Sequence, residues 1–238
     1  MNIVLIGSST GGPNQLKFLL NDIDFSNACV VIAQHMSANF IPSFVRQFNQ
    51  EAKAEVILAG DNELLMQGKI YICQQNSVFG GLLNISLNFS PEKTTFNPNI
   101  NLLFNSALNI AHTNNILAIL LTGMADDGAA GLFELYKKGV RCVCENEKDC
   151  VVFGMPKKAI ELNPKLRALS LNEIKKEILK LKQNNKTYSN QLYINGKLMR
   201  IFAIYQNHQR LVRGRFERKT QLFREQMGQL YQRRASSC

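Results

Sequence analysis

The chain has 238 residues, of which 45% are apolar and 19% charged, a balance that excludes a disordered chain and allows a sizeable core. No apolar run approaches the roughly 20 residues of a membrane-spanning helix, and Met1 leads into a short strand without the basic flank of a signal peptide, so we expect a cytoplasmic protein with no membrane insertion. Nearly all of the formal charge of +10 comes from residues 185–238, which hold 11 Lys and Arg against 2 Asp and Glu, whereas residues 1–184 hold 17 against 16.

The first strand runs into a glycine-rich corner. Apolar residues 3–6 are followed by Gly7-Ser8-Ser9-Thr10-Gly11-Gly12, and Pro13 opens a helix predicted over residues 14–21. Such a corner places N–H groups and a hydroxyl at the carboxyl edge of a parallel sheet. In a G-x-S-x-G frame, Ser9 occupies the position of a nucleophile on a sharp turn, although glycine and serine also cap ordinary helices.

A second buried strand is predicted over residues 28–33, and it ends at Gln34-His35-Met36. A short helical crossover requires the first two strands to be parallel, so His35 is expected at the same sheet edge as Ser9. A helix over residues 41–49 and a third strand over residues 55–59 follow. Three apolar stretches, at residues 69–73, 77–79 and 82–89, predict antiparallel hairpins at an edge of the sheet.

The second half of the chain continues the alternation of helices and strands. A helix is predicted over residues 101–114, with His112 near its end in a structural role. Residues 116–121 predict a central strand that runs into the loop from Thr122 to Gly131. A strand over residues 140–144, a helix opened by Pro156 and a capped helix over residues 171–182 complete a doubly wound α/β fold with a mostly parallel sheet and an antiparallel edge hairpin.

Three loops that follow predicted parallel strands supply Ser9, His35 and Asp127. A serine hydroxyl needs a base to take its proton, and a carboxylate must orient and stabilise that base. The order Ser, His, Asp differs from the Ser, Asp, His order of α/β-hydrolases and argues against that superfamily. The six cysteines include no C-x-x-C pair and lie mostly in apolar runs, so we expect no metal site and no cofactor.

Five segments follow one another along the chain: IGSSTGGP, VVIAQHM, PNINLLFNSA, ILLTGMADDGAAG and CENEKDCVVFGMPKKA. Together they resemble the catalytic domain of the chemotaxis-receptor methylesterases, the CheB family, over residues 1–184. The resemblance implies that Ser9 is the nucleophile, His35 the general base and Asp127 the orienting acid. It also implies that the substrate or oxyanion site is lined by Thr10, Gly11 and Met124. The implied reactions are hydrolysis of glutamate γ-methyl esters and deamidation of glutamines on the cytoplasmic helical region of methyl-accepting chemotaxis receptors.

The chain departs from the family pattern in two ways. Ala125 stands where the family has glycine, which matters if this position needs a positive φ, and Asp126 beside Asp127 leaves the choice of acid open, with Asp127 favoured because it precedes Gly128. The family also carries an N-terminal receiver domain, whereas the first predicted strand here begins at Met1 or Asn2. We therefore expect no control by phosphorylation within the chain.

Two other features of the sequence bear on binding functions. The glycine-rich corner would serve a phosphate- or nucleotide-binding module without esterase activity, but the chain has neither G-x-x-x-x-G-K-[ST] nor G-x-G-x-x-G, and the corner holds no lysine. Residues 185–238 are expected to form a basic extension with a hairpin over residues 191–205 and a helix over residues 216–234. No aromatic-basic recognition motif is present, so no nucleic acid partner is expected.

Overall fold

A computed structural model describes residues 1–81, 84–183, 191–194 and 197–200. The chain divides into two compact units, Met1–Asn185 and Lys186–Cys238. In the second unit, β11 (Gln191–Ile194) and β12 (Lys197–Arg200) pair antiparallel, as the expected hairpin requires. The predicted helix over residues 216–234 lies outside the described residues.

The first unit is built on a parallel sheet of seven strands in the order β10-β9-β8-β1-β2-β5-β3. Every neighbouring pair in this sheet is parallel, which confirms the predicted doubly wound fold. The strands are β1 (Asn2–Ser8), β2 (Ala28–Gln34), β3 (Glu55–Ala59), β5 (Lys69–Cys73), β8 (Asn115–Leu120), β9 (Arg141–Glu145) and β10 (Arg167–Leu169). The central strand β1 is covered on both faces, which explains its unbroken apolar run.

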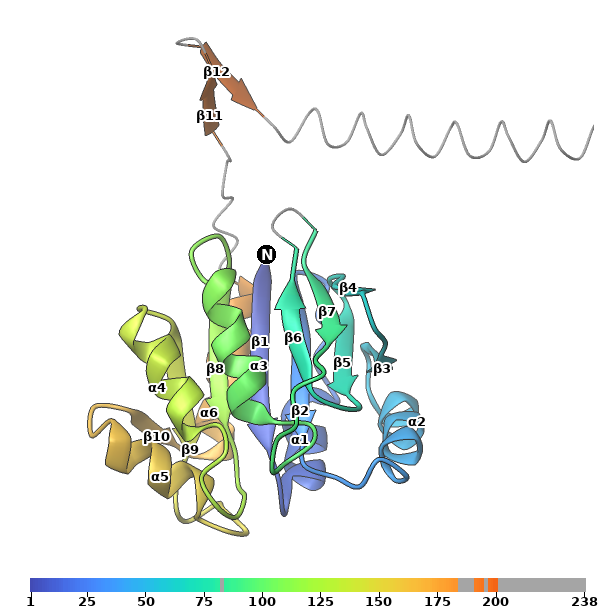
Figure 1. Cartoon of the computed structure of the whole chain (residues 1–238), viewed down its shortest axis with the longest axis vertical. Helices are drawn as coiled ribbons and strands as arrows, with labels where there is room; N and C mark the ends of the chain where they lie inside the picture. Colours follow the sequence, from blue (N-terminus) through green and yellow to red (C-terminus); the bar gives the residue numbers. More distant parts are fainter. Residues whose placement is uncertain (82–83, 184–190, 195–196, 201–238) are drawn as a thin grey trace, which may run out of the picture. The chain divides into compact units, whose positions relative to one another are not determined.

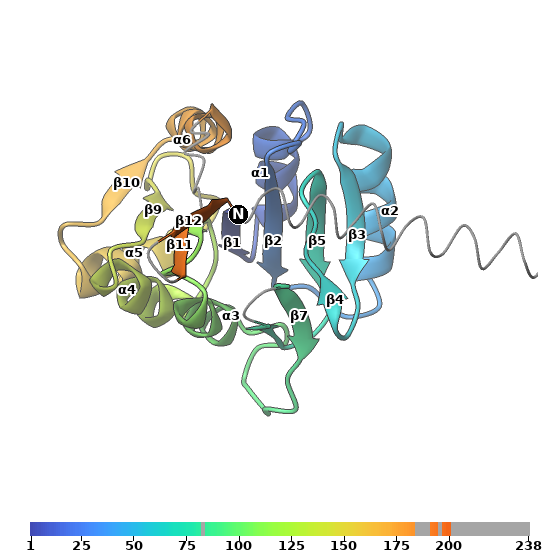
Figure 2. The same cartoon turned by 90° about the horizontal axis from the view of Figure 1, so that it is seen from above.

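Helices cover both faces of the sheet (Figures 1 and 2). One face carries α1 (Gly12–Leu20), α2 (Ile41–Glu51) and α6 (Leu171–Gln183), which pack with the sheet into one apolar core. The other carries α3 (Ile100–Ser106), the short helix η1 (Ala107–Asn109), α4 (Ala129–Lys137) and α5 (Met155–Leu162), which form a second core. None of the described helices is long and apolar enough to cross a membrane.

Two predictions of local structure were wrong. The stretch at residues 69–73 is not part of a hairpin, because β5 lies between β2 and β3 in the parallel sheet, with both of its faces buried. The antiparallel strands form a separate small sheet in the order β4 (Glu63–Leu64), β7 (Ser86–Phe89) and β6 (Ser77–Gly80). The predicted helix over residues 101–114 ends early, and His112 lies in a turn beyond η1.

Candidate active site

The carboxyl ends of β1, β2 and β8 lie side by side, because β1 pairs in parallel with both neighbours. Backbone hydrogen bonds continue this arrangement beyond the strands. The N–H of Ser9 donates to the carbonyl of Thr122 at 3.0 Å, and the N–H of His35 donates to the carbonyl of Ser8 at 2.9 Å. The three loops that sequence patterning singled out therefore meet at one edge of the sheet.

Adjacent serines in the first corner have different environments. Ser8 is fully buried, and its Oγ donates to Gln34 Oε1 at 2.6 Å. Ser9 is 9% exposed, and its carbonyl accepts from the N–H of Gly12 and from Gln34 Nε2, both at 2.9 Å. Gln34 Nε2 also donates to the carbonyl of His35. Its side chain thus joins both loops, a role that its position at the end of a buried strand did not reveal.

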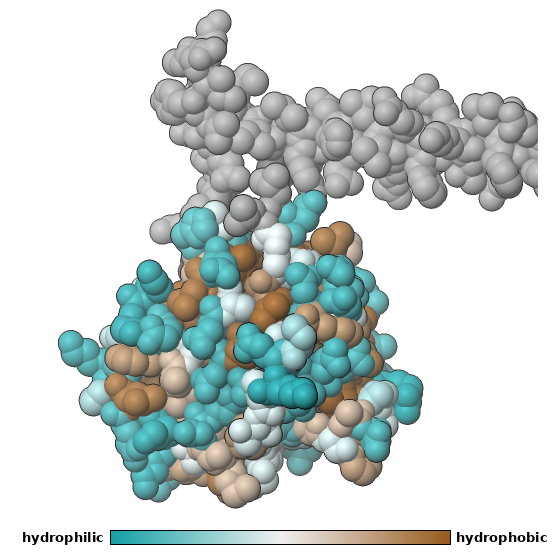
Figure 3. All heavy atoms as spheres, viewed as in Figure 1, coloured by the Kyte–Doolittle hydropathy of each residue, from teal (hydrophilic) through white to brown (hydrophobic). Residues whose placement is uncertain are grey.

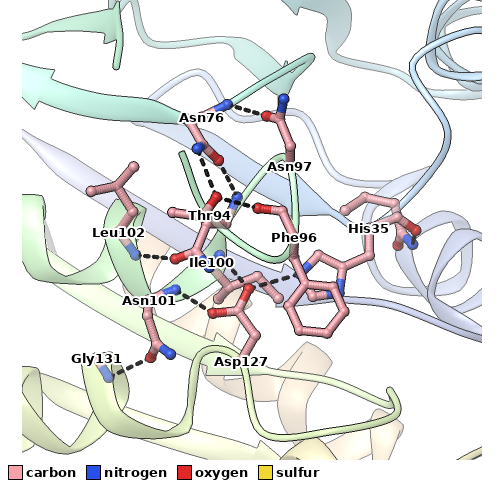
Figure 4. Close-up of polar contacts among 12 residues, drawn as sticks. His35, Asn76, Thr94, Phe96, Asn97, Ile100, Asn101, Leu102, Asp127 and Gly131 are labelled. Carbon is pink, nitrogen blue, oxygen red and sulfur yellow. Dashed lines mark hydrogen bonds and ion pairs between the residues drawn. The ribbon is translucent and has the colours of Figure 1, made fainter. Parts of the chain in front are cut away.

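His35 and Asp127 are in direct contact, with His35 Nε2 and Asp127 Oδ2 separated by 2.8 Å (Figure 4). The Asp127 carboxylate also accepts from the backbone N–H of Ile100 at 2.7 Å and of Asn101 at 2.9 Å, at the start of α3. Burial by itself would raise the pKa of Asp127, but the hydrogen bonds from His35, Ile100 and Asn101 outweigh it and lower this pKa. Asp127 is therefore held as the anion, whereas Asp126 is exposed.

The other nitrogen of the imidazole, His35 Nδ1, is buried and has no hydrogen-bond partner among the described residues. Because Nε2 is taken by Asp127, no hydrogen bond joins His35 to Ser9 in this structure. Hydrogen bonds between a nucleophile and its base often form only when substrate is bound. Nδ1 is therefore the imidazole nitrogen of His35 that is free to accept a proton.

Of the three residues expected to line the site, Thr10 and Gly11 belong to the glycine-rich corner itself, and Met124 follows Gly123, which packs against Ser9. Thr10 and Met124 are exposed, with Met124 at 68%. Gly11 precedes α1 with a φ of +87°, and a Cβ there would lie 2.5 Å from a methyl carbon of Val151. Glycine is thus required at this position by both conformation and space.

The loop after β8 approaches the first corner closely. A Cβ at Gly123 would lie 2.6 Å from the Cβ of Ser9, so only glycine allows the two loops to pack. Ala125 has a φ of +68°, so this departure from the family pattern does fall at a position with positive φ. Sequence patterning did not single out Gly123.

Glu145 is a buried residue of the site that the sequence analysis did not identify. It ends β9, is 0% exposed, and accepts from the N–H of Thr122 at 2.6 Å and from Gln15 Nε2 at 2.5 Å. Burial raises its pKa to about 7, while the hydrogen bond from Thr122 acts in the opposite direction. Since the carbonyl of Thr122 accepts from the N–H of Ser9, Glu145 is linked through Thr122 to the glycine-rich corner that holds Ser9. A charged residue at the end of an apolar strand was the available signal.

Exposed apolar side chains stand beside this edge of the sheet. Met124 follows Gly123, and Val151, 65% exposed, lies against Gly11. On the face seen in Figure 3, by contrast, hydrophilic residues predominate and apolar residues form small separate patches. Met124 and Val151 therefore form an exposed apolar rim beside the polar side chains of this edge.

Residues 4–178 match the family model described as CheB methylesterase. The chain belongs to this family. It is 34% identical to a protein-glutamate methylesterase/protein-glutamine glutaminase of Shewanella oneidensis over 182 residues, which cover 74% of this chain and 51% of that protein. Its identity to the Salmonella typhi protein of the same description is 32%, with coverage of 74% and 52%.

Among solved structures, the fold matches the crystal structure of the Thermotoga maritima CheB methylesterase catalytic domain. The TM-score is 0.69 at 30% sequence identity, and the match covers 75% of this chain and 97% of that domain. The chain thus spans about half the length of the curated relatives that it matches. These matches confirm the family resemblance and the fold class.

Proposed function

We propose that this protein is a serine hydrolase that cleaves glutamate γ-methyl esters on chemoreceptors, releases methanol and also deamidates receptor glutamines during chemotaxis adaptation. The contact of His35 with the buried anion Asp127, at the same sheet edge as Ser9, is the observation that carries the proposal. Membership of the CheB methylesterase family supports it. We propose the cytoplasmic helical region of methyl-accepting chemotaxis receptors as the partner, and with it a cytoplasmic location.

The proposed reaction proceeds through an acyl-enzyme. Ser9 Oγ attacks the ester carbonyl carbon while His35 Nδ1 takes the hydroxyl proton, and Asp127 stabilises the imidazolium that forms. The tetrahedral intermediate expels methoxide, which receives the proton from His35 and leaves as methanol. A water molecule, deprotonated by His35, then hydrolyses the glutamyl ester of Ser9. For a glutamine substrate the same steps release ammonia.

The oxyanion of the tetrahedral intermediate needs hydrogen-bond donors that the fold has not already used. Among the described residues, no hydrogen bond involves the backbone N–H groups of Thr10, Gly11 and Met124. They lie in the two loops that contact each other at Ser9 and Gly123. We assign the oxyanion site to these N–H groups, with the apolar rim of Met124 and Val151 facing the ester methyl group.

The test compares two adjacent serines. Ser9→Ala should lower methanol release from methylated receptor by about four to six orders of magnitude and abolish labelling by a fluorophosphonate, because the nucleophile is lost. Ser8→Ala removes only the hydrogen bond to Gln34 and should keep most of the activity. Asp127→Asn should cost far more activity than Asp126→Asn. Full activity of Ser9→Ala, or equal losses for both serines, would refute the proposal.

A further inference from the structure

A phenylalanine ring lies flat against the candidate base. The rings of His35 and Phe96 are stacked with centroids 4.5 Å apart and an angle of 10° between their planes (Figure 4). Phe96 belongs to the segment of residues 90–99, which connects β7 to α3. The resemblance to the family did not single out this residue, and the mechanism above does not use it.

The position of Phe96 is fixed by a polar network centred on a buried side chain, Asn76, which is 3% exposed. Asn76 Oδ1 accepts from the N–H of Asn99 at 2.8 Å, and the N–H of Asn76 donates to Asn97 Oδ1 at 2.6 Å. Asn76 Nδ2 donates to Thr94 Oγ1 at 2.8 Å, and this hydroxyl donates to the carbonyl of Phe96 at 2.6 Å. Hydrogen bonds thus hold the segment both before Phe96 in the chain, at Thr94, and after it, at Asn97 and Asn99.

The same segment continues into the residues that hold the orienting acid. Asn99 caps α3 by accepting from the N–H of Leu102, and the next two N–H groups, of Ile100 and Asn101, bind Asp127. The imidazole is therefore held at its edge by Asp127 and on one face by Phe96, and a single stretch of chain positions both. A flat ring on that face opposes rotation of the imidazole, and its negative face favours the positively charged imidazolium over the neutral form.

We propose that Phe96 is a positioning residue of the hydrolase, holding the His35 ring with Nδ1 free for the Ser9 proton and stabilising the imidazolium. The proposal rests on the function proposed for Ser9, His35 and Asp127. Removal of the stacked ring should slow the steps in which His35 carries a proton. Substrate binding should be unaffected, because the ring acts through the imidazole.

The experiment uses the full chain and three variants. Phe96→Leu removes the flat ring but keeps an apolar side chain, whereas Phe96→Tyr keeps the ring. Phe18→Leu is the matched control, since Phe18 is 46% exposed on α1 and its ring faces Lys175. Steady-state methanol release gives kcat and KM on methylated receptor, and the rate of fluorophosphonate labelling reports the reactivity of Ser9 without any receptor.

Phe96→Leu should lower both kcat and the labelling rate roughly three- to tenfold with KM unchanged, as expected from the size of an aromatic stacking contact. Phe96→Tyr should remain within about twofold of the wild type, and Phe18→Leu should equal it. Thr94→Val, which loses the hydroxyl bonded to the Phe96 carbonyl, should give an intermediate loss. This second variant keeps the test decisive if Phe96→Leu does not fold.

The two proposals fail in different ways. If Ser9 of the wild type is labelled but Phe96→Leu and Thr94→Val react at the wild-type rate, the role of Phe96 is refuted and the function stands. A tyrosine variant as slow as the leucine variant, or an effect on KM alone, also refutes it. If the wild type is neither labelled at Ser9 nor dependent on Ser9 for activity, both proposals fall.

Discussion

Replacement of Glu145 by glutamine tests whether this buried carboxyl, which accepts from the N–H of Thr122, controls the pH dependence of stability. Glu145 is 0% exposed, and burial raises its pKa from 4.5 to about 7. The folded protein therefore keeps this proton up to about pH 7, whereas the unfolded chain loses it near pH 4.5. Between these values the folded state binds more protons, so its stability falls as the pH rises.

The size of the effect follows from the shift in pKa. At about 1.4 kcal/mol per pH unit, the rise from 4.5 to about 7 corresponds to about 3 kcal/mol. This stabilisation is fully present below pH 4.5 and is lost as the pH rises through about 7. Glutamine resembles the protonated carboxyl and stays neutral, so the stability of Glu145→Gln relative to the wild type should increase by about 2 to 3 kcal/mol between pH 5 and pH 8, because part of the effect is already lost below pH 5.

Urea unfolding followed by far-UV circular dichroism gives the free energy of unfolding, and it suits a chain that contains no tryptophan. Both proteins are measured at pH 5, 6, 7 and 8, so that the contributions of other titrating groups cancel in the difference. Glu147→Gln is the matched control, because Glu147 is exposed two residues further along the chain. A difference between Glu145→Gln and the wild type that is the same at pH 5 and pH 8 would refute the reasoning.

Two further predictions concern position 125 and the chain boundary. Ala125→Gly should stabilise the protein by about 0.5 kcal/mol in urea unfolding at unchanged activity, because relief of strain at a φ of +68° exceeds the added entropy of the unfolded chain. A loss of 1 kcal/mol or more would contradict this. We propose that residues 1–184 form the catalytic domain and 185–238 a basic extension, so truncation after Lys186 should leave methanol release and the unfolding midpoint unchanged. An unfolded or inactive product would place the extension inside the domain.

Local patterns in the sequence determined the fold class and the catalytic candidates. A β-branched apolar run that stops at glycine and serine, followed by proline, specifies a strand, a corner and a helix start whatever the rest of the chain does. Short helical crossovers require the strands to pair in parallel, so the sequence predicts that Ser9, His35 and Asp127 lie at one edge of the sheet. It does not predict the distances between them. The regions of the sequence that supported these inferences are the same ones that match the CheB methylesterase family.

Tertiary structure decided the features that depend on contacts between distant parts of the chain. The run at residues 69–73 reads equally well as a hairpin strand, and only burial on both faces places β5 inside the sheet. Asp127 differs from Asp126 because the start of α3, about 26 residues away, donates two N–H groups to its carboxylate. Glu145 and Phe96 carry no motif of their own. Their roles arise from the contact of Glu145 with Thr122 and of Phe96 with His35. These residues are far apart in the sequence, so packing of the whole domain, and not the neighbouring residues, brings them together.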